Sequence, residues 1–387
     1  MTPETGQRLL VARGELARTA FAPDPDAPAQ RSLLDGEARL AIERFALTAN
    51  NLTYAAFGEA MKYWQFFPAT EPAWGCLPVW GFATVTESRA AGVEPGRRMW
   101  GFLPAGTHLV VQPGRVQSAG FADHAEHRRD LPAIYNHYVA CDADALWQPA
   151  HEGLQAVLRP LFTTAFLLDD FLAGNDWFGA RRLLLSSASS KTAYATAHAL
   201  TRRRGRPGVP DVVGLTSAAH QAFSRALGCH DEIRLYDELE SLDPGVPTVY
   251  VDFAGNAALR RRVHEHLGAA LRYSCSIGGT HWSLLGQAGG LPGPRPTLFF
   301  APAQAARRAA PPPEGWGRAG LEQRIAEAWS GFLARATAGD EPWIRIEHAS
   351  GAAAVERAWR SLLDGSADPR TGILLDLRAQ PAAAGDR

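Results

Sequence analysis

LLLSSASSKTAYATAHAL, residues 183–200, is the stretch that decides the fold. It begins with an apolar run typical of a buried strand, continues with small residues, and ends in an Ala- and Thr-rich run typical of a helix. In a dinucleotide-binding turn, small side chains let the backbone approach a pyrophosphate, and the first N–H groups of the helix face the anion. The stretch therefore predicts a strand, a phosphate-binding turn and a helix.

The turn departs from the usual pattern because serines stand where glycines are usual and because it holds Lys191, one of two lysines in the chain. In one interpretation the serine hydroxyls and the Lys191 ammonium contact phosphate. In the other, the serines only cap the helix. A serine that requires a positive φ is strained, so we expect the local backbone to be regularised. The cofactor-binding residues predicted here are Ser187, Ser189, Ser190, Lys191 and Thr192.

The composition is that of a globular protein. The 387 residues are 46% hydrophobic and 20% charged, enough for two domains of ordinary size. The formal net charge of −1 gives no overall field that would attract nucleic acid or an anionic membrane. We therefore expect a small-molecule substrate and neither a nucleic-acid nor a membrane partner.

The four cysteines lie far apart without C-x-x-C spacing, which favours a reducing compartment over a disulfide framework or a zinc ribbon. The N-terminal residues lack the pattern of a signal peptide, and no apolar run approaches the roughly 18 residues of a membrane span. These features predict a cytoplasmic protein.

Two kinds of organisation follow one another along the chain. The first part has short strand-like segments separated by Gly and Pro, which favours a β-rich unit. A helical segment follows at 153–174, and strands then alternate with helices up to about residue 282, which predicts a parallel sheet. The strands of this second part are expected at the start of 183–200 and at 211–217, 246–255 and 270–282.

Six segments resemble the medium-chain dehydrogenase/reductase superfamily, specifically its zinc-free quinone and enoyl reductase branch. The chain also resembles a subgroup catalogued only as a domain of unknown function, in which the SSASSKT loop recurs and no reaction is assigned. The segments are ALTANNLTY (46–54), LVVQP (109–113), PLFTTAF (160–166), LGCHDEIRLYDE (227–238), VYVDFAGNAAL (249–259) and TGILLDL (371–377).

The resemblance implies an α/β protein in which a Rossmann-type parallel sheet domain accompanies a β-rich, GroES-like catalytic domain. The dinucleotide-binding domain is expected at 156–299, and the catalytic domain at 1–155 and 300–387. Dimers formed through the sheet edge are common among similar proteins, so a homodimer is expected.

NADPH is the predicted cofactor. The second strand of the alternating part ends at Ser217, where an Asp or Glu would favour NADH by accepting the ribose 2′-OH. His220 and Arg225 follow and suit a 2′-phosphate, although they are also compatible with a solvated helix start. The further cofactor-binding residues implied by the resemblance or by their place at strand ends are Thr164, Ser217, Phe253, Ala254, Gly255, Ser276, Gly278 and Phe300.

No metal site is predicted. Cys76 stands near the position of a ligand in zinc alcohol dehydrogenases, but no Gly-His-Glu follows, which disfavours zinc-polarised chemistry. The carboxyl pair Asp169-Asp170 is expected on a solvated helix face or at a cap.

Metal-free hydride transfer needs a proton or hydrogen-bond donor near the developing charge. Tyr54 and Tyr63 are candidates, and Lys62 beside Tyr63 could lower its pKa if the chain makes a non-helical turn there. Asn51 could donate to a carbonyl, and by resemblance His281 approaches the nicotinamide. In the alternative interpretation, the tyrosines simply pack the core or an interface.

The resulting hypothesis is a zinc-independent, NADPH-dependent oxidoreductase that reduces an activated C=C bond, of the enoyl or quinone type, or a C=O bond. The aromatic residues favour an apolar or acyl-type substrate. Two alternatives remain open: a lyase, isomerase or acyl-coenzyme A enzyme on the same fold, and a nucleotide-binding sensor without catalysis.

Overall fold

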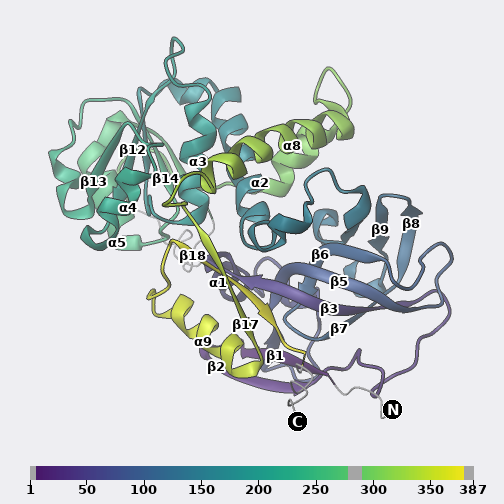
Figure 1. Ribbon diagram of the computed structural model, residues 1–387. Coiled ribbons are helices and arrows are strands. Elements are labelled where there is room, and N and C mark those ends of the chain that lie inside the picture. The colour runs from purple at the N-terminus through teal and green to yellow at the C-terminus, as the bar shows by residue number, and fades with distance from the viewer. Residues whose placement is uncertain (1–5, 278–289, 379–387) are drawn as a thin grey trace. The chain divides into compact units, whose positions relative to one another are not determined.

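The computed structural model describes residues 6–277 and 290–378 and divides into two compact units (Figure 1). Unit 1 contains Met1–Val157 and Arg345–Arg387, and unit 2 contains Leu158–Ile344. A parallel sheet in unit 2 and β-rich sheets in unit 1 confirm the predicted α/β class. Unit 2 runs on to residue 344, whereas the sequence suggested a boundary at 299/300.

Unit 2 is built on a six-stranded sheet in which every adjacent pair is parallel. Its order is β13-β12-β11-β14-β15-β16, so the chain first builds outward on one side of β11 and then returns to build on the other. The order reverses between β11 and β14, and in open α/β sheets ligands bind at the carboxyl ends of such strands. The strands are β11 (Arg182–Leu185), β12 (Asp211–Thr216), β13 (Glu232–Leu235), β14 (Thr248–Asp252), β15 (Leu271–Ser276) and β16 (Thr297–Leu298).

The central strands β11 and β14 form because their sequences are largely apolar and every residue in them is buried, which suits strands covered on both faces. Leu184 of β11 and Tyr250 of β14 are fully buried against Leu259 and Val263 of α5. The helices that accompany the sheet are α2 (Glu152–Gly174), α3 (Lys191–Thr201), α4 (Gln221–Ala226), α5 (Ala257–Leu267), α7 (Ala301–Ala309) and α8 (Gly317–Ala336).

The Asp169-Asp170 pair of α2 explains why residues 301–336 belong to unit 2. Asp169 receives two hydrogen bonds from Arg203, at 2.8 and 2.9 Å. Asp170 receives two from Arg308 of α7, at 2.6 and 2.9 Å, and one from Gln304 at 2.6 Å. Both carboxyl groups are buried, so the expectation of a solvated face is wrong: the pair ties α2 to the end of α3 and to α7.

Unit 1 contains a nine-stranded sheet of order β17-β18-β3-β5-β6-β10-β9-β8, in which β7 also pairs with β3, and a three-stranded sheet of order β2-β1-β4. Helix α9 (Ala352–Leu363) lies beside β2, where Trp359 donates to the Leu16 carbonyl at 2.8 Å (Figure 1). The other elements are β1 (Gln7–Ala12), β2 (Glu15–Pro23), β3 (Ala38–Leu47), α1 (Ala49–Ala56), β4 (Trp74–Cys76), β5 (Pro78–Ser88), β6 (Arg98–Pro104), β7 (His108–Val111), β8 (Pro113–Gln117), β9 (Gly120–Asp123), β10 (His137–Ala140), β17 (Arg345–Ser350) and β18 (Thr371–Asp376).

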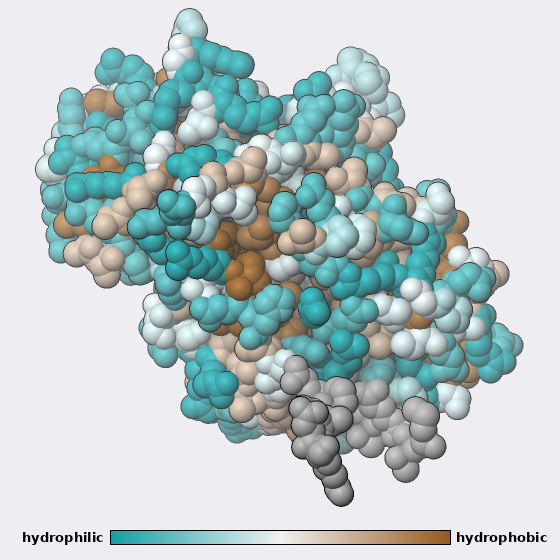
Figure 2. Space-filling view, viewed as in Figure 1, coloured by the Kyte–Doolittle hydropathy of each residue, from teal (hydrophilic) through white to brown (hydrophobic). Residues whose placement is uncertain are grey.

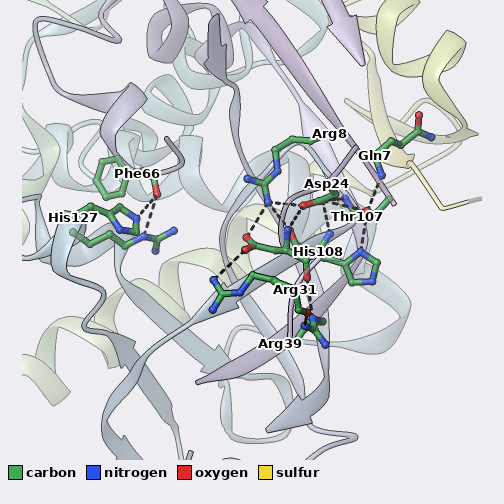
Figure 3. A network of polar contacts seen from close by, with 11 residues as sticks. Gln7, Arg8, Asp24, Arg31, Arg39, Phe66, Thr107, His108 and His127 are labelled. Carbon is green, nitrogen blue, oxygen red and sulfur yellow. Dashed lines mark hydrogen bonds and ion pairs between the residues drawn. The ribbon is translucent and has the colours of Figure 1, made fainter. Parts of the chain in front are cut away.

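A buried network of charges joins the first strand of unit 1 to β7 and to the loop after β2 (Figure 3). The Arg8 guanidinium donates to Asp24 at 2.7 Å, to Asp26 at 3.0 Å and to the His108 carbonyl at 3.1 Å. The second carboxylate oxygen of Asp24 accepts from the backbone N–H groups of Thr107 and His108, at 3.0 and 2.9 Å. Asp24 has no exposed surface, so this carboxylate is a structural anchor of unit 1.

Within the part of the chain that the structure describes, no helix is long and apolar enough to cross a membrane. The face drawn in Figure 2 is covered largely by hydrophilic residues.

Candidate functional site

The loop after β11 is linked to the turn after β14 by one hydroxyl group. Ser186 is fully buried, and its Oγ donates to Oδ1 of Asp252 at 3.1 Å. The same oxygen accepts from the N–H groups of Phe253 and Ala254, at 2.9 and 3.0 Å. The N–H of Gly255 donates to Oδ1 of Asp252 at 3.0 Å. Because all three amides are occupied within the protein, this turn can contact a ligand only through its carbonyls and side chains.

Asp252 also forms a buried ion pair with α5. Its Oδ2 accepts from Nε and Nη2 of Arg260, at 2.9 and 2.8 Å, while the two residues are 1% and 5% exposed. A carboxylate that accepts from two guanidinium nitrogens, a serine hydroxyl and an amide is positioned to shape the turn and not to act as a base.

Ser187 adopts the left-handed conformation that glycine usually provides, with φ of 52°. The expectation of a regularised backbone is therefore wrong. Its N–H donates to the hydroxyl of Tyr236 at 3.1 Å, a contact from η8 (Tyr236–Ser241) that helps to hold the strained residue. Sequence reasoning missed Tyr236, although it lies in the LGCHDEIRLYDE segment that carried the family resemblance.

The strain at Ser187 gives a testable prediction. Ser187→Val should lower the free energy of unfolding by about 1–3 kcal/mol, because a β-branched side chain tolerates positive φ poorly. Ser187→Gly should leave stability unchanged or raise it slightly, since the relief of strain offsets the greater freedom of the unfolded chain. Urea unfolding of the two variants measures both effects, and a valine variant as stable as wild type would contradict the assigned conformation.

Ser190 is the N-cap of α3, with Oγ accepting from the N–H of Ala193 at 3.4 Å, as the capping interpretation predicts. Lys191 and Thr192 form the first turn of the helix and are half-buried. Among the described residues, no acceptor takes the N–H of Thr192. The positive end of α3 therefore offers a donor beside a lysine, which suits an anion.

Ser189 connects this loop to the end of β12. It is 6% exposed, and its Oγ lies 3.2 Å from Nδ1 of His220. Ser217 is half-buried, directly follows β12 and accepts the N–H of His220 at 3.1 Å, whereas Arg225 is exposed on α4. Some of the polar residues predicted after β11 and β12 are therefore in contact: His220 bonds to both Ser189 and Ser217.

The remaining predicted cofactor residues lie in different surroundings. Thr164 bonds to a carbonyl one turn earlier in α2, at 3.1 Å. Ser276 ends β15, is 1% exposed, and its buried hydroxyl has no hydrogen-bond partner among the residues that the structure describes. Phe300 is half-buried at the start of α7. Gly278 and His281 lie outside the described residues.

The predicted catalytic tyrosines lie in unit 1 and belong to one group of packed rings. Tyr54 and Tyr63 have ring centroids 4.6 Å apart, and Tyr135 lies 6.4 and 5.9 Å from them. These three rings are 4%, 5% and 8% exposed, so they pack in the core as the alternative interpretation states. We call the group the tyrosine cluster; it consists of Tyr54, Tyr63 and Tyr135 with Phe66, Trp80 and Phe102.

The lysine expected to assist Tyr63 does not do so. Lys62 has φ of 61°, so the required non-helical turn is present, but its side chain is exposed. The pKa of Tyr63 is raised because the phenol is buried, and this effect outweighs the hydrogen bond from the Tyr135 hydroxyl, which favours the ionised form. The predicted lowering of this pKa is therefore wrong, since burial outweighs any effect of a solvated ammonium.

Asn51 is committed to the backbone. Its Oδ1 accepts from the N–H of Thr48 at 2.7 Å, and its Nδ2 donates to the Pro78 carbonyl at 2.8 Å. Asn51 is 3% exposed and links the start of α1 to β5. Both ends of its side chain are thus used within the protein, whereas the sequence suggested a donor to substrate.

The thiol that resembled a zinc ligand lies in the core. Cys76 is fully buried, and burial raises its pKa to about 12. Since zinc binds the thiolate, a thiol in this environment is a poor ligand. Within residues 6–277 and 290–378, no three His, Cys, Asp or Glu side chains gather into a metal site.

Comparison with solved structures gives extensive matches at low identity. CurA from Vibrio vulnificus in complex with NADPH is 13% identical, with a TM-score of 0.58 over 97% of this chain and 100% of that one. The CurK enoyl reductase is 14% identical, with a TM-score of 0.52 over 97% and 100%. The quinone oxidoreductase from Coxiella burnetii is 12% identical, with a TM-score of 0.50 over 96% and 99%.

These likenesses confirm the fold of medium-chain dehydrogenases and reductases that the sequence segments predicted. No curated protein matches the chain. The family described as "Protein of unknown function (DUF2855)" matches residues 45–368, which is most of the chain. The protein belongs to this family.

Proposed function

We propose that this protein binds NADPH at the carboxyl ends of β11, β12 and β14 and uses it to reduce an activated C=C or C=O bond without zinc. The observation that carries the proposal is the conformation of Ser187. A serine keeps the left-handed turn of a dinucleotide-binding loop, directly at the reversal of strand order where such ligands bind. Positive φ at a serine costs free energy, and such strain is concentrated at ligand-binding sites, so its presence here supports a loop that still binds a ligand.

The residues present fit a dinucleotide. The first turn of α3 contains the N–H of Thr192 and the cationic residue Lys191, and both suit the negative charge of a pyrophosphate. The hydroxyl of Ser276, buried at the end of β15 and without a partner in the described part of the chain, suits a polar group of the cofactor, because a buried hydroxyl without a partner is costly. CurA, which shares the fold, was solved with NADPH.

NADPH is favoured over NADH by the residues at the end of β12. No carboxylate stands there to accept a ribose 2′-OH; Ser217 and His220 offer a hydroxyl and an imidazole, and Arg225 adds a nearby charge. These groups complement the negative charge of a 2′-phosphate.

When bound, the cofactor supplies a hydride. This chain supplies the rest: in unit 2, the α3 loop binds the phosphates and the Ser186–Asp252 link fixes the turn beside them. Burial raises the pKa of Tyr54 and Tyr63, so both stay protonated at neutral pH and can donate to an oxygen that becomes negative. The protonated, buried Cys76 favours chemistry without zinc.

A thermal shift assay tests the proposal. NADPH at 100 times its Kd should stabilise the folded protein by about 2.7 kcal/mol, with a smaller effect of NADH at the same concentration. Stabilisation by coenzyme A alone would favour the acyl-enzyme alternative. NADPH binding without turnover of any alkene or carbonyl compound would favour the sensor. No shift with either nicotinamide at millimolar concentration would overturn the proposal.

Lys191→Ala should weaken NADPH binding at least tenfold, because it removes the cation at the phosphate turn, and this loss should be much larger than the loss of folding stability. Lys62→Ala is the matched control, since it removes the other lysine, which is exposed in unit 1. Equal NADPH affinity in the Lys191 variant and wild type would remove this lysine from the site.

A further inference from the structure

Three neighbouring side chains of unit 1 each carry a buried polar atom that has no hydrogen-bond partner among the residues that the structure describes. The atoms are Nη2 of Arg128, Oδ2 of Asp123 and Oδ1 of Asn136. The three residues are 1%, 2% and 8% exposed, so bulk solvent does not reach these atoms. A buried donor or acceptor without a partner is costly, most of all when the group is charged, so three such atoms in one place require an explanation.

The three side chains are connected to one another, and we call them the Arg128 cluster. Nη1 of Arg128 lies 3.2 Å from Oδ2 of Asp123, as an ion pair without the alignment of a hydrogen bond. Nδ2 of Asn136 donates to the Arg128 carbonyl at 3.1 Å. The Asn136 carbonyl accepts from the N–H of Asp123 at 2.8 Å. The orphaned atoms therefore belong to one cluster, where β9 ends and the chain returns to β10.

The other side-chain groups of the ion pair are already in use. Oδ1 of Asp123 accepts from two backbone N–H groups, both at 3.0 Å. Nε of Arg128 donates to the Phe66 carbonyl at 3.2 Å, and its Nη1 donates to the Tyr138 hydroxyl at 3.0 Å. These bonds fix both side chains from several directions. Neither can rotate to pair its orphaned atom without breaking a bond that it now makes.

The orphaned atoms are two acceptors and one donor, and this combination selects the group that can pair with all of them. An ammonium ion has only donors, so it would bring a second cation to the Arg128 guanidinium. An anion would face the two acceptor oxygens, and an apolar group would leave all three atoms unpaired. A water molecule can donate to both oxygens and accept from the guanidinium, and buried waters typically make about three hydrogen bonds.

We propose that the Arg128 cluster binds one water molecule, which donates to Oδ2 of Asp123 and Oδ1 of Asn136 and accepts from Nη2 of Arg128. A buried ion pair supports a fold only when its remaining hydrogen-bonding groups are satisfied, and this water satisfies them. It thereby completes the connection from β9 through Arg128 to the Phe66 carbonyl. The site lies wholly within unit 1 and is independent of the proposed NADPH binding.

A high-resolution crystal structure of the full wild-type chain tests the position of the water. We expect a density peak that lies about 2.7–3.2 Å from each of the three orphaned atoms. A structure without this peak, in which Nη2 of Arg128 bonds directly to Asp123, would overturn the proposal. The wild-type density decides this point even if a variant fails to fold.

Oxygen-17 magnetic relaxation dispersion tests the identity of the bound molecule, because it detects only water that stays on the protein for longer than the protein takes to tumble. Asn136→Leu removes one of the two acceptors and places an apolar side chain against the site. We expect this variant to hold one long-lived water fewer than wild type. The same number of long-lived waters in both proteins would show that the cluster does not hold water, whatever the density.

Asn51→Leu is the matched control, since Asn51 is another buried amide of unit 1. Both ends of its side chain bond directly to the backbone, to the N–H of Thr48 at 2.7 Å and to the Pro78 carbonyl at 2.8 Å. Its loss should lower the urea midpoint of unfolding and leave the number of long-lived waters unchanged. If Asn51→Leu also releases one water, the loss reports a general loosening of unit 1 and the relaxation result counts against the site. Circular dichroism verifies that each variant is folded.

Discussion

Replacement of Asp252 by alanine is expected to lower the free energy of unfolding by about 3–5 kcal/mol, the usual cost of leaving one partner of a buried ion pair alone. Arg260 would keep its charge at 5% exposure without a counter-ion. Ser186 and the N–H of Gly255 would each lose a hydrogen-bond partner as well. Asp252→Asn should be nearly as damaging. An asparagine side chain has one oxygen and one NH2 group, so its NH2 group would face either the guanidinium of Arg260 or the N–H of Gly255, and both of these are donors.

Urea unfolding followed by circular dichroism measures this effect. Glu240→Gln is the control, since Glu240 also accepts two hydrogen bonds from one arginine, Arg262, at 2.9 and 2.8 Å, but one on each oxygen and on the surface. Exposed pairs contribute about 1 kcal/mol or less, so this variant should unfold close to wild type. An Asp252→Ala variant within about 1 kcal/mol of wild type would show that the ion pair does not hold the turn.

The second large effect is expected in unit 1, where Asp24→Ala should also cost about 3–5 kcal/mol. Arg8 would lose the closer of its two carboxylates and remain buried. The backbone N–H groups of Thr107 and His108 would be left without the oxygen that now accepts both. The network of Figure 3 connects segments distant in sequence, so its loss should loosen β1 and β7 together.

Asp35→Asn provides the comparison for Asp24. Asp35 pairs with Arg89 on the surface, where its side chain is 90% exposed, and its substitution should leave the unfolding midpoint nearly unchanged. If both variants unfold at the wild-type urea concentration, the buried network is not a determinant of stability.

Much of the fold was predictable because its determinants are local. The apolar runs at β11 and β14 identify buried strands, and Ser190 before an Ala-rich segment identifies a helix start. The resemblance then supplied the order of the two units. These signals need only neighbouring residues.

The site was less predictable because its contacts are distant in sequence. Ser187 keeps a strained φ with the help of the Tyr236 hydroxyl, 49 positions away. Phe253 and Ala254 were predicted to bind the cofactor, but their backbone amides donate to Ser186, 67 and 68 positions away. Single-sequence patterns do not report such pairings.

The C-terminal boundary of unit 2 and the environment of Lys62 were also hard to predict, because both depend on contacts that sequence order does not reveal. Helix α7 joins unit 2 through the Arg308–Asp170 contact, which spans 138 positions. Lys62 next to Tyr63 suggested a pair, but adjacent residues diverge, and one is exposed where the other is buried. Adjacency in sequence was a poor guide to contact at both places.

Titration of the wild-type protein with NADPH, followed by the fluorescence of the dihydronicotinamide, tests the central claim most directly. The account predicts saturable binding to one site per chain below millimolar concentration. It also predicts displacement by 2′,5′-ADP at lower concentrations than by 5′-AMP, because Ser217, His220 and Arg225 favour the 2′-phosphate. No saturable change in fluorescence up to millimolar NADPH would contradict the assignment of the β11–α3 loop as a dinucleotide site.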